Sequence, residues 1–235
     1  MKLLKPWRWT LPGLPRIFDA LCAAGGLILL APLFAILALV ILWDDGRPVF
    51  FSQERIGRTG KRFRIWKLRT MRAGSRGIAI TAAGDRRVTR SGHVLRKYKL
   101  DELPQLFNVL RGDMSLVGPR PEMPEYVQTG APIWQAVLQV QPGITDLASL
   151  VYREEEEILG ASADPETTYR NQVLPAKLLL NLEYLRVRSF RRDLKLILLS
   201  IGYSLFPRKI DPDSICRALC EAGSCRATAT VKRDL

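Results

Sequence analysis

The longest uncharged stretch of the chain runs from Ala20 to Trp43. As a straight helix it would be about 36 Å long, more than the roughly 30 Å hydrocarbon core of a bilayer. Pro32, near its middle, removes one backbone hydrogen bond and favours a bend. Cationic residues flank the stretch on both sides, and such flanks prefer the cytoplasm. We expect a helix that enters one leaflet, bends at Pro32 and returns; a spanning helix is the alternative.

A second apolar pattern follows a pair of acidic residues. Apolar positions recur at i, i+3, i+4 and i+7, in Leu103, Leu106, Phe107 and Leu110. This spacing predicts a helix with one face toward the core, and Pro104 fits its first turn. Asp101 and Glu102 then lie at or just before the helix N-terminus, where partial positive charge suits a carboxylate or a phosphate. From spacing alone, an Asp at this position is most often an N-cap.

The remaining pattern predicts a mostly α fold with a small β element. Residues 48–71 read as two short strands joined by a turn at 57–60. Residues 171–189 and 192–206 read as helices. The second has an apolar side that suits an amphipathic helix in a membrane interface, formed by Leu194, Ile197, Leu198, Ile201 and Leu205.

The net charge of the chain limits the kinds of molecule it is expected to bind. The 235 residues include 36 Lys and Arg against 23 Asp and Glu, a formal net charge of +13. Such an excess favours nucleic acid, anionic lipid head groups or phosphorylated substrates. No nucleic-acid motif with interleaved aromatic residues is present. The single histidine, His93, has no Gly-x-Ser-x-Gly sequence to partner it, which argues against a Ser-His-Asp triad.

Several ordered motifs surround the acidic pair. They are Arg16-Ile17-Phe18-Asp19, the segments 48–57 and 63–71, the block 99–116 around Asp101-Glu102, Val117-Gly118-Pro119-Arg120-Pro121, and Gln141-Pro142-Gly143-Ile144-Thr145. Together they resemble the bacterial sugar transferase family of small monotopic phosphoglycosyl transferases. The resemblance covers the chain from about Pro15 to about Phe206.

The resemblance implies an enzyme that moves a sugar-1-phosphate from a UDP-sugar to polyprenyl (undecaprenyl) phosphate and releases UMP. This would be the first membrane step of a bacterial glycoconjugate pathway, such as exopolysaccharide biosynthesis. Asp101 would be the nucleophile of a covalent aspartyl-phosphosugar intermediate, and Asp101 and Glu102 would bind Mg²⁺. The rival interpretation is a non-catalytic, membrane-anchored basic protein that binds anionic lipid or nucleic acid.

The same resemblance suggests substrate-binding residues. Arg120 is the leading phosphate clamp, and Lys67, Arg69 and Arg96 are weaker candidates. Lys67 and Arg69 share the predicted face of the second strand. The set is completed by Gln105 and by the residues that would shape the turn around Arg120, namely Gly118, Pro119 and Pro121.

The resemblance also implies how the chain is divided and where it lies relative to the membrane. We expect an interfacial lead-in and re-entrant helix at 1–47, a cytoplasmic catalytic domain at 48–206 and a polar tail at 207–235, all one functional domain. The protein should lie on the cytoplasmic face of the bacterial inner membrane, with both termini in the cytoplasm. Its expected partners are the UDP-sugar, polyprenyl phosphate and membrane phospholipids, without nucleic acid.

Overall fold

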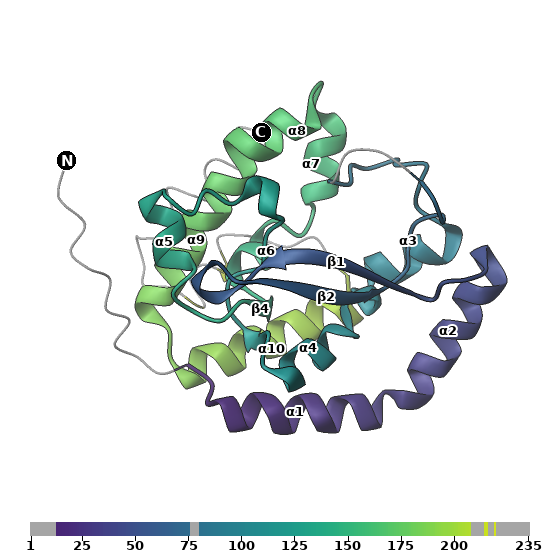
Figure 1. Ribbon diagram of the computed structural model, residues 1–235, viewed down its shortest axis with the longest axis horizontal. Coiled ribbons are helices and arrows are strands. Elements are labelled where there is room, and N and C mark those ends of the chain that lie inside the picture. Colours follow the sequence, from purple (N-terminus) through teal and green to yellow (C-terminus); the bar gives the residue numbers. More distant parts are fainter. Residues whose placement is uncertain (1–12, 76–79, 208–213, 216–218, 220–235) are drawn as a thin grey trace.

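The computed structural model describes residues 13–75, 80–207, 214–215 and 219. Over this part of the chain the protein is mostly helical with little β-structure, as predicted (Figure 1). The α-helices are α1 Arg16–Leu29, α2 Ala31–Asp45, α3 Arg90–Lys97, α4 Gln105–Arg111, α5 Pro132–Val137, α6 Leu147–Val151, α7 Glu155–Ala161, α8 Pro165–Thr168, α9 Leu174–Val187 and α10 Phe190–Leu205. The strands are β1 Phe50–Ile56, β2 Arg62–Leu68, β3 Ser115–Val117 and β4 Gly143–Thr145.

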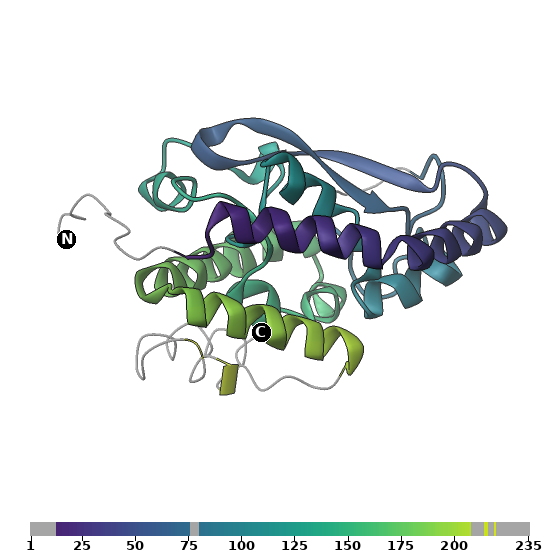
Figure 2. The same ribbon diagram turned by 90° about the horizontal axis from the view of Figure 1, so that it is seen from below.

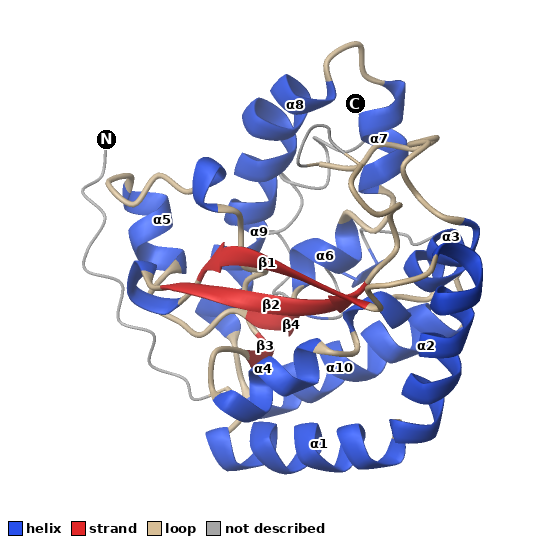
Figure 3. Ribbon diagram, turned by 45° about the vertical axis from the view of Figure 1, so that its right-hand side comes forward, coloured by secondary structure: helices blue, strands red, loops and turns tan. Residues whose placement is uncertain are grey.

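The predicted break at Pro32 is present. Helix α1 ends at Leu29, α2 begins at Ala31, and Pro32 lies in the first turn of α2. The two helix axes are bent by 59° (Figure 3). Among the described residues, no single helix has both the length and the apolar composition needed to cross a membrane, whereas this bent pair taken together has them.

Both ends of the bent pair are fixed to the rest of the protein. In α1, the buried carboxylate of Asp19 accepts hydrogen bonds from the Ser115 hydroxyl at 2.8 Å and the Leu116 N–H at 3.1 Å. At the end of α2, Arg69 donates to the carbonyl oxygens of Asp45 and Gly46 at 2.9 and 2.6 Å. The pair therefore wraps along the body of the molecule, and Figure 2 shows α1 running beside α10.

The predicted hairpin is confirmed. Strands β1 and β2 pair antiparallel, with Phe50 opposite Leu68 and Ile56 opposite Arg62, around a turn at Arg58–Gly60. The sequence did not predict the parallel pair of β3 and β4, because three-residue strands are too short to show an alternating pattern.

The largest apolar core lies around α5, α6 and α9. Ile215 and Leu219 belong to this core, so the segment predicted as a polar tail contributes at least these two buried side chains. Residues 1–12, which include most of the predicted lead-in, lie outside the described residues, as does most of 207–235.

Helix α4 is oriented differently from the prediction. Phe107 and Leu110 are 45% and 40% exposed, whereas Asn108 and Val109 are fully buried. The apolar stripe therefore faces the core only in part: Leu106 packs against the small core cluster around Val109 and lies beside Gly26 of α1, and Leu103 is half-buried. Phe107 and Leu110 are open. The physical reason is the edge of β2. Asn108 accepts from the Trp66 N–H at 3.1 Å and donates to the Arg64 carbonyl at 2.7 Å.

Asn108→Ala should destabilise the protein by about 2–4 kcal/mol, because it leaves two buried backbone groups of β2 without partners. Chemical denaturation of the purified protein in detergent measures this. Phe107→Ala, next to it on the exposed side, is the matched control and should cost less than about 1 kcal/mol. Equal stability of the Asn108 variant and the wild type would contradict this role.

Candidate functional site

The two acidic residues lie in a short 3₁₀ turn, Leu100–Glu102, between α3 and α4. Lys99 precedes the turn with φ of +56°, a left-handed conformation that redirects the chain after α3. Asp101 and Glu102 are only 6% and 8% exposed. Burial of two adjacent carboxylates is energetically unfavourable. The groups around each carboxylate therefore decide whether it stays charged.

Glu102 is held by two cations from other segments. Lys67 Nζ, from β2, lies 3.1 Å from Glu102 Oε1. Arg120 donates from Nη1 to Oε2 at 3.2 Å and from Nη2 to Oε1, which makes the contact bidentate. Burial alone would raise the pKa of Glu102, but Arg120 and Lys67 outweigh it and hold that pKa well below its usual range. Glu102 is therefore a fixed negative charge.

Asp101 has the opposite character. Its Oδ1 is buried and has no hydrogen-bond partner within the described structure. Burial raises the pKa of Asp101; Lys67 opposes this shift, and so do Lys99 and Arg96. A buried carboxylate oxygen without a partner costs about 1–3 kcal/mol or more. Such a group is typical of a site that awaits a ligand.

Arg120 reaches the dyad because its turn is clamped against β4. Gly118 N–H donates to the Thr145 carbonyl at 3.1 Å, and Gly143 N–H donates to the Pro119 carbonyl at 3.0 Å. A Cβ on Gly118 would lie 2.2 Å from the Gln141 carbonyl oxygen, so only glycine fits. Gly118 and Pro119 thus act as supports for Arg120. Pro121 does the same, since its carbonyl accepts from Arg55 at 3.3 Å.

The other predicted residues lie at different distances from the dyad. Arg96 donates to the Thr70 hydroxyl at 3.0 Å and to Glu156 at 2.8 Å, and its charge acts on Asp101. Gln105 is buried in the first turn of α4, and its Nε2 has no partner in the described structure.

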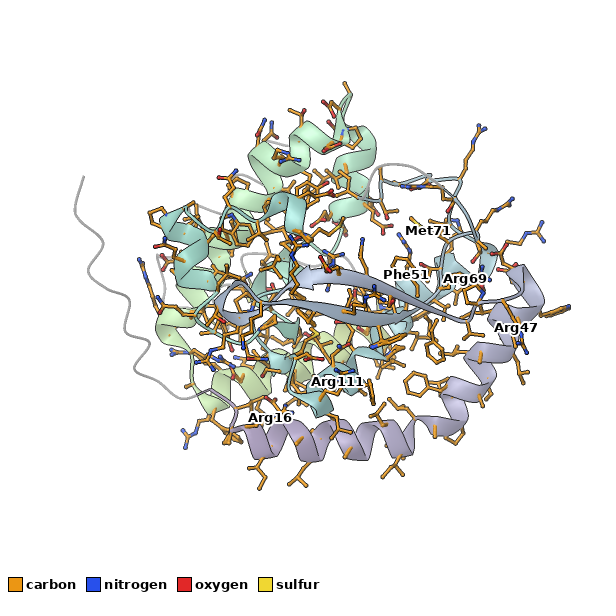
Figure 4. The ribbon with its side chains drawn as sticks, viewed as in Figure 1. Arg16, Arg47, Phe51, Arg69, Met71 and Arg111 are labelled. Atoms are coloured by element: carbon orange, nitrogen blue, oxygen red, sulfur yellow. The ribbon has the colours of Figure 1, made fainter. Side chains whose placement is uncertain are left out.

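The structure does not bring Arg69 to the dyad. Strand β2 ends at Leu68, so the alternation that placed Arg69 on the face of Lys67 no longer applies. Arg69 lies at the end of α2, where it also pairs with the Asp45 carboxylate at 3.1 Å (Figure 4). Its position indicates an anchor for α2.

Sequence reasoning missed a second group of buried and half-buried polar residues, which we call the Glu122 cluster. It consists of Arg55, Glu122, Tyr152, Glu155, Tyr169 and Lys177. Arg55 Nη1 lies 3.7 Å from Glu122 Oε2, and Lys177 Nζ lies 2.8 Å from Glu155 Oε2. Two signals were available: Glu122 directly follows the Gly-Pro-Arg-Pro turn, and Lys177 stands within an apolar run of α9.

The dyad could hold a hard cation with help from a substrate. The described residues contain no group of three or more His, Cys, Asp or Glu side chains suited to a metal ion. Mg²⁺ commonly uses only one or two protein carboxylates and completes its shell with water and substrate phosphates. The unpartnered oxygen of Asp101 fits that pattern. Glu102 already accepts three hydrogen bonds from Lys67 and Arg120, which leaves it about one further lone-pair site for a metal ion.

Asp101→Asn should raise the free energy of unfolding at neutral pH, because it removes a buried carboxylate whose folded-state pKa is raised. The gain should shrink as pH falls through that pKa toward 3.8, since the folded and unfolded states then both bind the proton. Denaturant unfolding across pH measures this.

Glu102→Gln is the matched control with the opposite sign. It should cost about 3 kcal/mol at neutral pH, because it breaks a buried ion pair whose carboxylate has a lowered pKa. That loss should shrink as pH falls through the folded-state pKa of Glu102. Equal destabilisation by the two variants at pH 7 would contradict the contrast between the two carboxylates.

Comparison with known proteins places this site in a family. The model of the family described as bacterial sugar transferase matches residues 12–206. The chain is 39% identical over 191 residues to UDP-glucose:undecaprenyl-phosphate glucose-1-phosphate transferase of Caulobacter vibrioides, covering 79% of this chain and 67% of that protein. It is 38% identical over 202 residues to undecaprenyl-phosphate glucose phosphotransferase of Komagataeibacter xylinus, covering 82% and 36%.

A third relative matches a shorter part of this chain. A putative undecaprenyl-phosphate N-acetylgalactosaminyl 1-phosphate transferase of Bacillus subtilis is 43% identical over 115 residues, covering 48% of this chain and 64% of that protein. This chain thus spans between about one third and two thirds of these relatives. Since the family match includes the hairpin, the acidic dyad and the turn of Arg120, the chain belongs to the bacterial sugar transferase family.

Proposed function

We propose that this protein transfers a sugar-1-phosphate from a UDP-sugar to polyprenyl phosphate and releases UMP. Relatives over most of this chain bear names that describe sugar-phosphate transfer to undecaprenyl phosphate. The single observation that carries the proposal is the contrast within the dyad. Glu102 is neutralised by Lys67 and Arg120, whereas a buried oxygen of Asp101 has no partner among the residues that the structure describes.

That contrast suits Asp101 as a nucleophile. In the first half-reaction, Asp101 Oδ1 forms a bond to the β-phosphorus of the UDP-sugar. The bond from this phosphorus to the bridging oxygen breaks, and UMP leaves with the electron pair. In the second, an oxygen of the lipid phosphate attacks the same phosphorus, which releases the Asp101 carboxylate and completes transfer of the phosphosugar.

The surrounding cations suit two anionic substrates. Arg120 has five N–H donors, and the bidentate contact to Glu102 leaves others free to bind phosphate oxygens. Lys67 and Arg96 add positive charge beside Asp101. Magnesium, when held by Asp101 and the pyrophosphate, would neutralise part of the charge on the phosphoryl oxygens.

We also propose a re-entrant, monotopic placement on the cytoplasmic face of the inner membrane. Helices α1, α2, α4 and α10 leave large apolar side chains exposed, among them Ile17, Leu21, Ile28, Leu29, Ile36, Leu39, Phe107, Leu110, Leu194, Leu198, Ile201 and Leu205. Trp43, at the end of α2, is 93% exposed, as suits a residue of the membrane interface. Figure 4 shows side chains of α1 pointing away from the body.

The anchoring of α1 and α2 supports the same placement. Asp19 ties α1 to β3, and Arg69 ties the end of α2 to the segment after β2. A helix pair with both ends bound to one body has both ends on one side of a bilayer. Apolar patches of this extent are unusual on monomeric soluble proteins.

Protein mixed with a UDP-sugar and magnesium, without lipid, should release up to one UMP per active site. The peptide containing Asp101 should gain the mass of one phosphosugar, and polyprenyl phosphate should then discharge it. Quenched-flow UMP detection and peptide mass spectrometry measure both. Chelating the magnesium should prevent formation of the adduct.

Asp101→Asn should abolish the burst and the adduct, whereas Asp164→Asn, the same change at an exposed helix cap of α8, should leave both intact. Release of UMP only after lipid is added would instead indicate direct attack within a ternary complex. A binding protein without activity would release no UMP under either condition.

Reporter tags at residues 1 and 235 should be equally inaccessible from the periplasm in intact cells, because a re-entrant pair returns the chain to the side it came from. Protease or thiol-reagent labelling measures accessibility, with permeabilised cells as the control. If only the N-terminal tag is labelled in intact cells, α1 and α2 cross the membrane and the re-entrant placement is wrong.

A further inference from the structure

The Glu122 cluster adjoins the dyad through Arg120. Glu122 lies two residues after Arg120 in the same clamped turn, and its charge acts on that guanidinium. Arg55 pairs with Glu122 and donates to the Pro121 carbonyl of the same turn. Lys177 lies over the ring of Tyr169, 5.5 Å from its centroid, and pairs with Glu155. The cluster is thus continuous with the site that holds Asp101.

Hydrogen-bonding groups in this region are left without partners. In the described part of the chain, six buried side-chain nitrogen or oxygen atoms lack a hydrogen-bond partner. Two belong to Asp101 and Gln105 at the dyad, two to the Glu122 cluster (the Tyr152 hydroxyl and Arg55 Nε), and two to Arg69. Tyr152 is only 2% exposed, and Lys177 and Glu155 lie near enough to influence its hydroxyl. A buried hydroxyl that has no partner among the described residues suggests one that is supplied by a ligand.

The charges of the two regions differ. Four cations act on the dyad, which contains two carboxylates: Lys67, Arg96, Lys99 and Arg120. The Glu122 cluster has two cations, Arg55 and Lys177, against two carboxylates, Glu122 and Glu155. An excess of positive charge suits a pyrophosphate, whereas a neutral group rich in donors and acceptors suits an uncharged polyol.

We propose that the Glu122 cluster binds hydroxyl groups of the transferred sugar and so determines which UDP-sugar is used, with the Tyr152 hydroxyl as one of the recognising groups. This inference rests on the proposed function. The dyad and Arg120 would hold the phosphates, which every UDP-sugar shares. The cluster would contact the hydroxyl groups of the sugar ring, whose arrangement distinguishes one UDP-sugar from another.

The test uses Tyr152→Phe in the full chain, because this change removes only a hydroxyl for which the described part of the chain provides no partner. Steady-state release of UMP with polyprenyl phosphate present is measured with a panel of UDP-hexoses and their monodeoxy analogues. For the preferred UDP-sugar, kcat/KM should fall about three- to tenfold, the range expected for one uncharged hydrogen bond. For the analogue that lacks the recognised hydroxyl, the variant and wild type should be equal, because the two deletions remove the same interaction.

Three further measurements separate recognition from other roles. The melting temperature of Tyr152→Phe should not fall, and inhibition by UMP should be unchanged. Tyr203→Phe on α10, the same chemical change outside the cluster, should alter nothing. An equal loss on every UDP-sugar, a weaker inhibition by UMP, or no loss on any substrate would each overturn the proposal.

A binding experiment keeps this proposal distinct from the proposed function. In Asp101→Asn protein, which should not turn over, calorimetry compares a UDP-sugar with UDP. The sugar should add affinity, and Tyr152→Phe should remove about three- to tenfold of that increment. If wild type releases no UMP but this increment is found and is lost in the variant, the transferase proposal fails while sugar recognition stands. An affinity for the UDP-sugar that Tyr152→Phe leaves unchanged would overturn sugar recognition.

Discussion

The buried carboxylate of Glu102 stays charged because Lys67 and Arg120 come to it from two other parts of the chain. Lys67 is 35 residues away and Arg120 is 18 residues away, so this one group joins the hairpin, the 3₁₀ turn and the turn after β3. A carboxylate buried without such partners would be protonated or would unfold the site. The rest of the site depends on this contact, since it fixes the position of Arg120 and the conformation in which Asp101 is presented.

Two neighbouring residues of similar chemistry thus take different roles. Glu102 accepts hydrogen bonds from Lys67 and Arg120, whereas one oxygen of Asp101 has no partner within the described residues. Their environments push their pKa values in opposite directions, as is common where two carboxylates share one site.

Local patterns predicted the features that depend on neighbouring residues. The break at Pro32 and the hairpin around residues 57–60 follow from missing donors and turn residues, and the structure contains both. The orientation of α4 could not be predicted in this way. Periodicity identifies an apolar face of a helix. Whether that face packs on the core, on another helix or against lipid depends on the neighbouring segments, which periodicity does not reveal.

Ion pairs between residues far apart in the chain also could not be predicted from the sequence. Arg69 and Lys67 stand two residues apart, yet one anchors α2 and the other holds Glu102, because the strand ends between them. The partners of Glu122 are Arg55 in β1 and Tyr169 in the segment before α9. No pattern of spacing in the sequence predicts that these residues are in contact. The dyad and Arg120, which the structure brings into contact, did stand out in the sequence, because they lie in compact motifs that resemble those of a known family.

The contact between Gly118 and Gly143 has a consequence for how inactive variants are interpreted. A Cβ on either glycine would lie 2.1–2.2 Å from backbone atoms of the facing segment, so neither backbone can be kept in place with a larger residue. Neither glycine needs to touch a substrate for its replacement to inactivate the protein. In a mutational scan the two would score like catalytic residues, although the lesion would be a displaced Arg120. Only a measurement of the Arg120–Glu102 contact itself can tell these two kinds of inactivation apart.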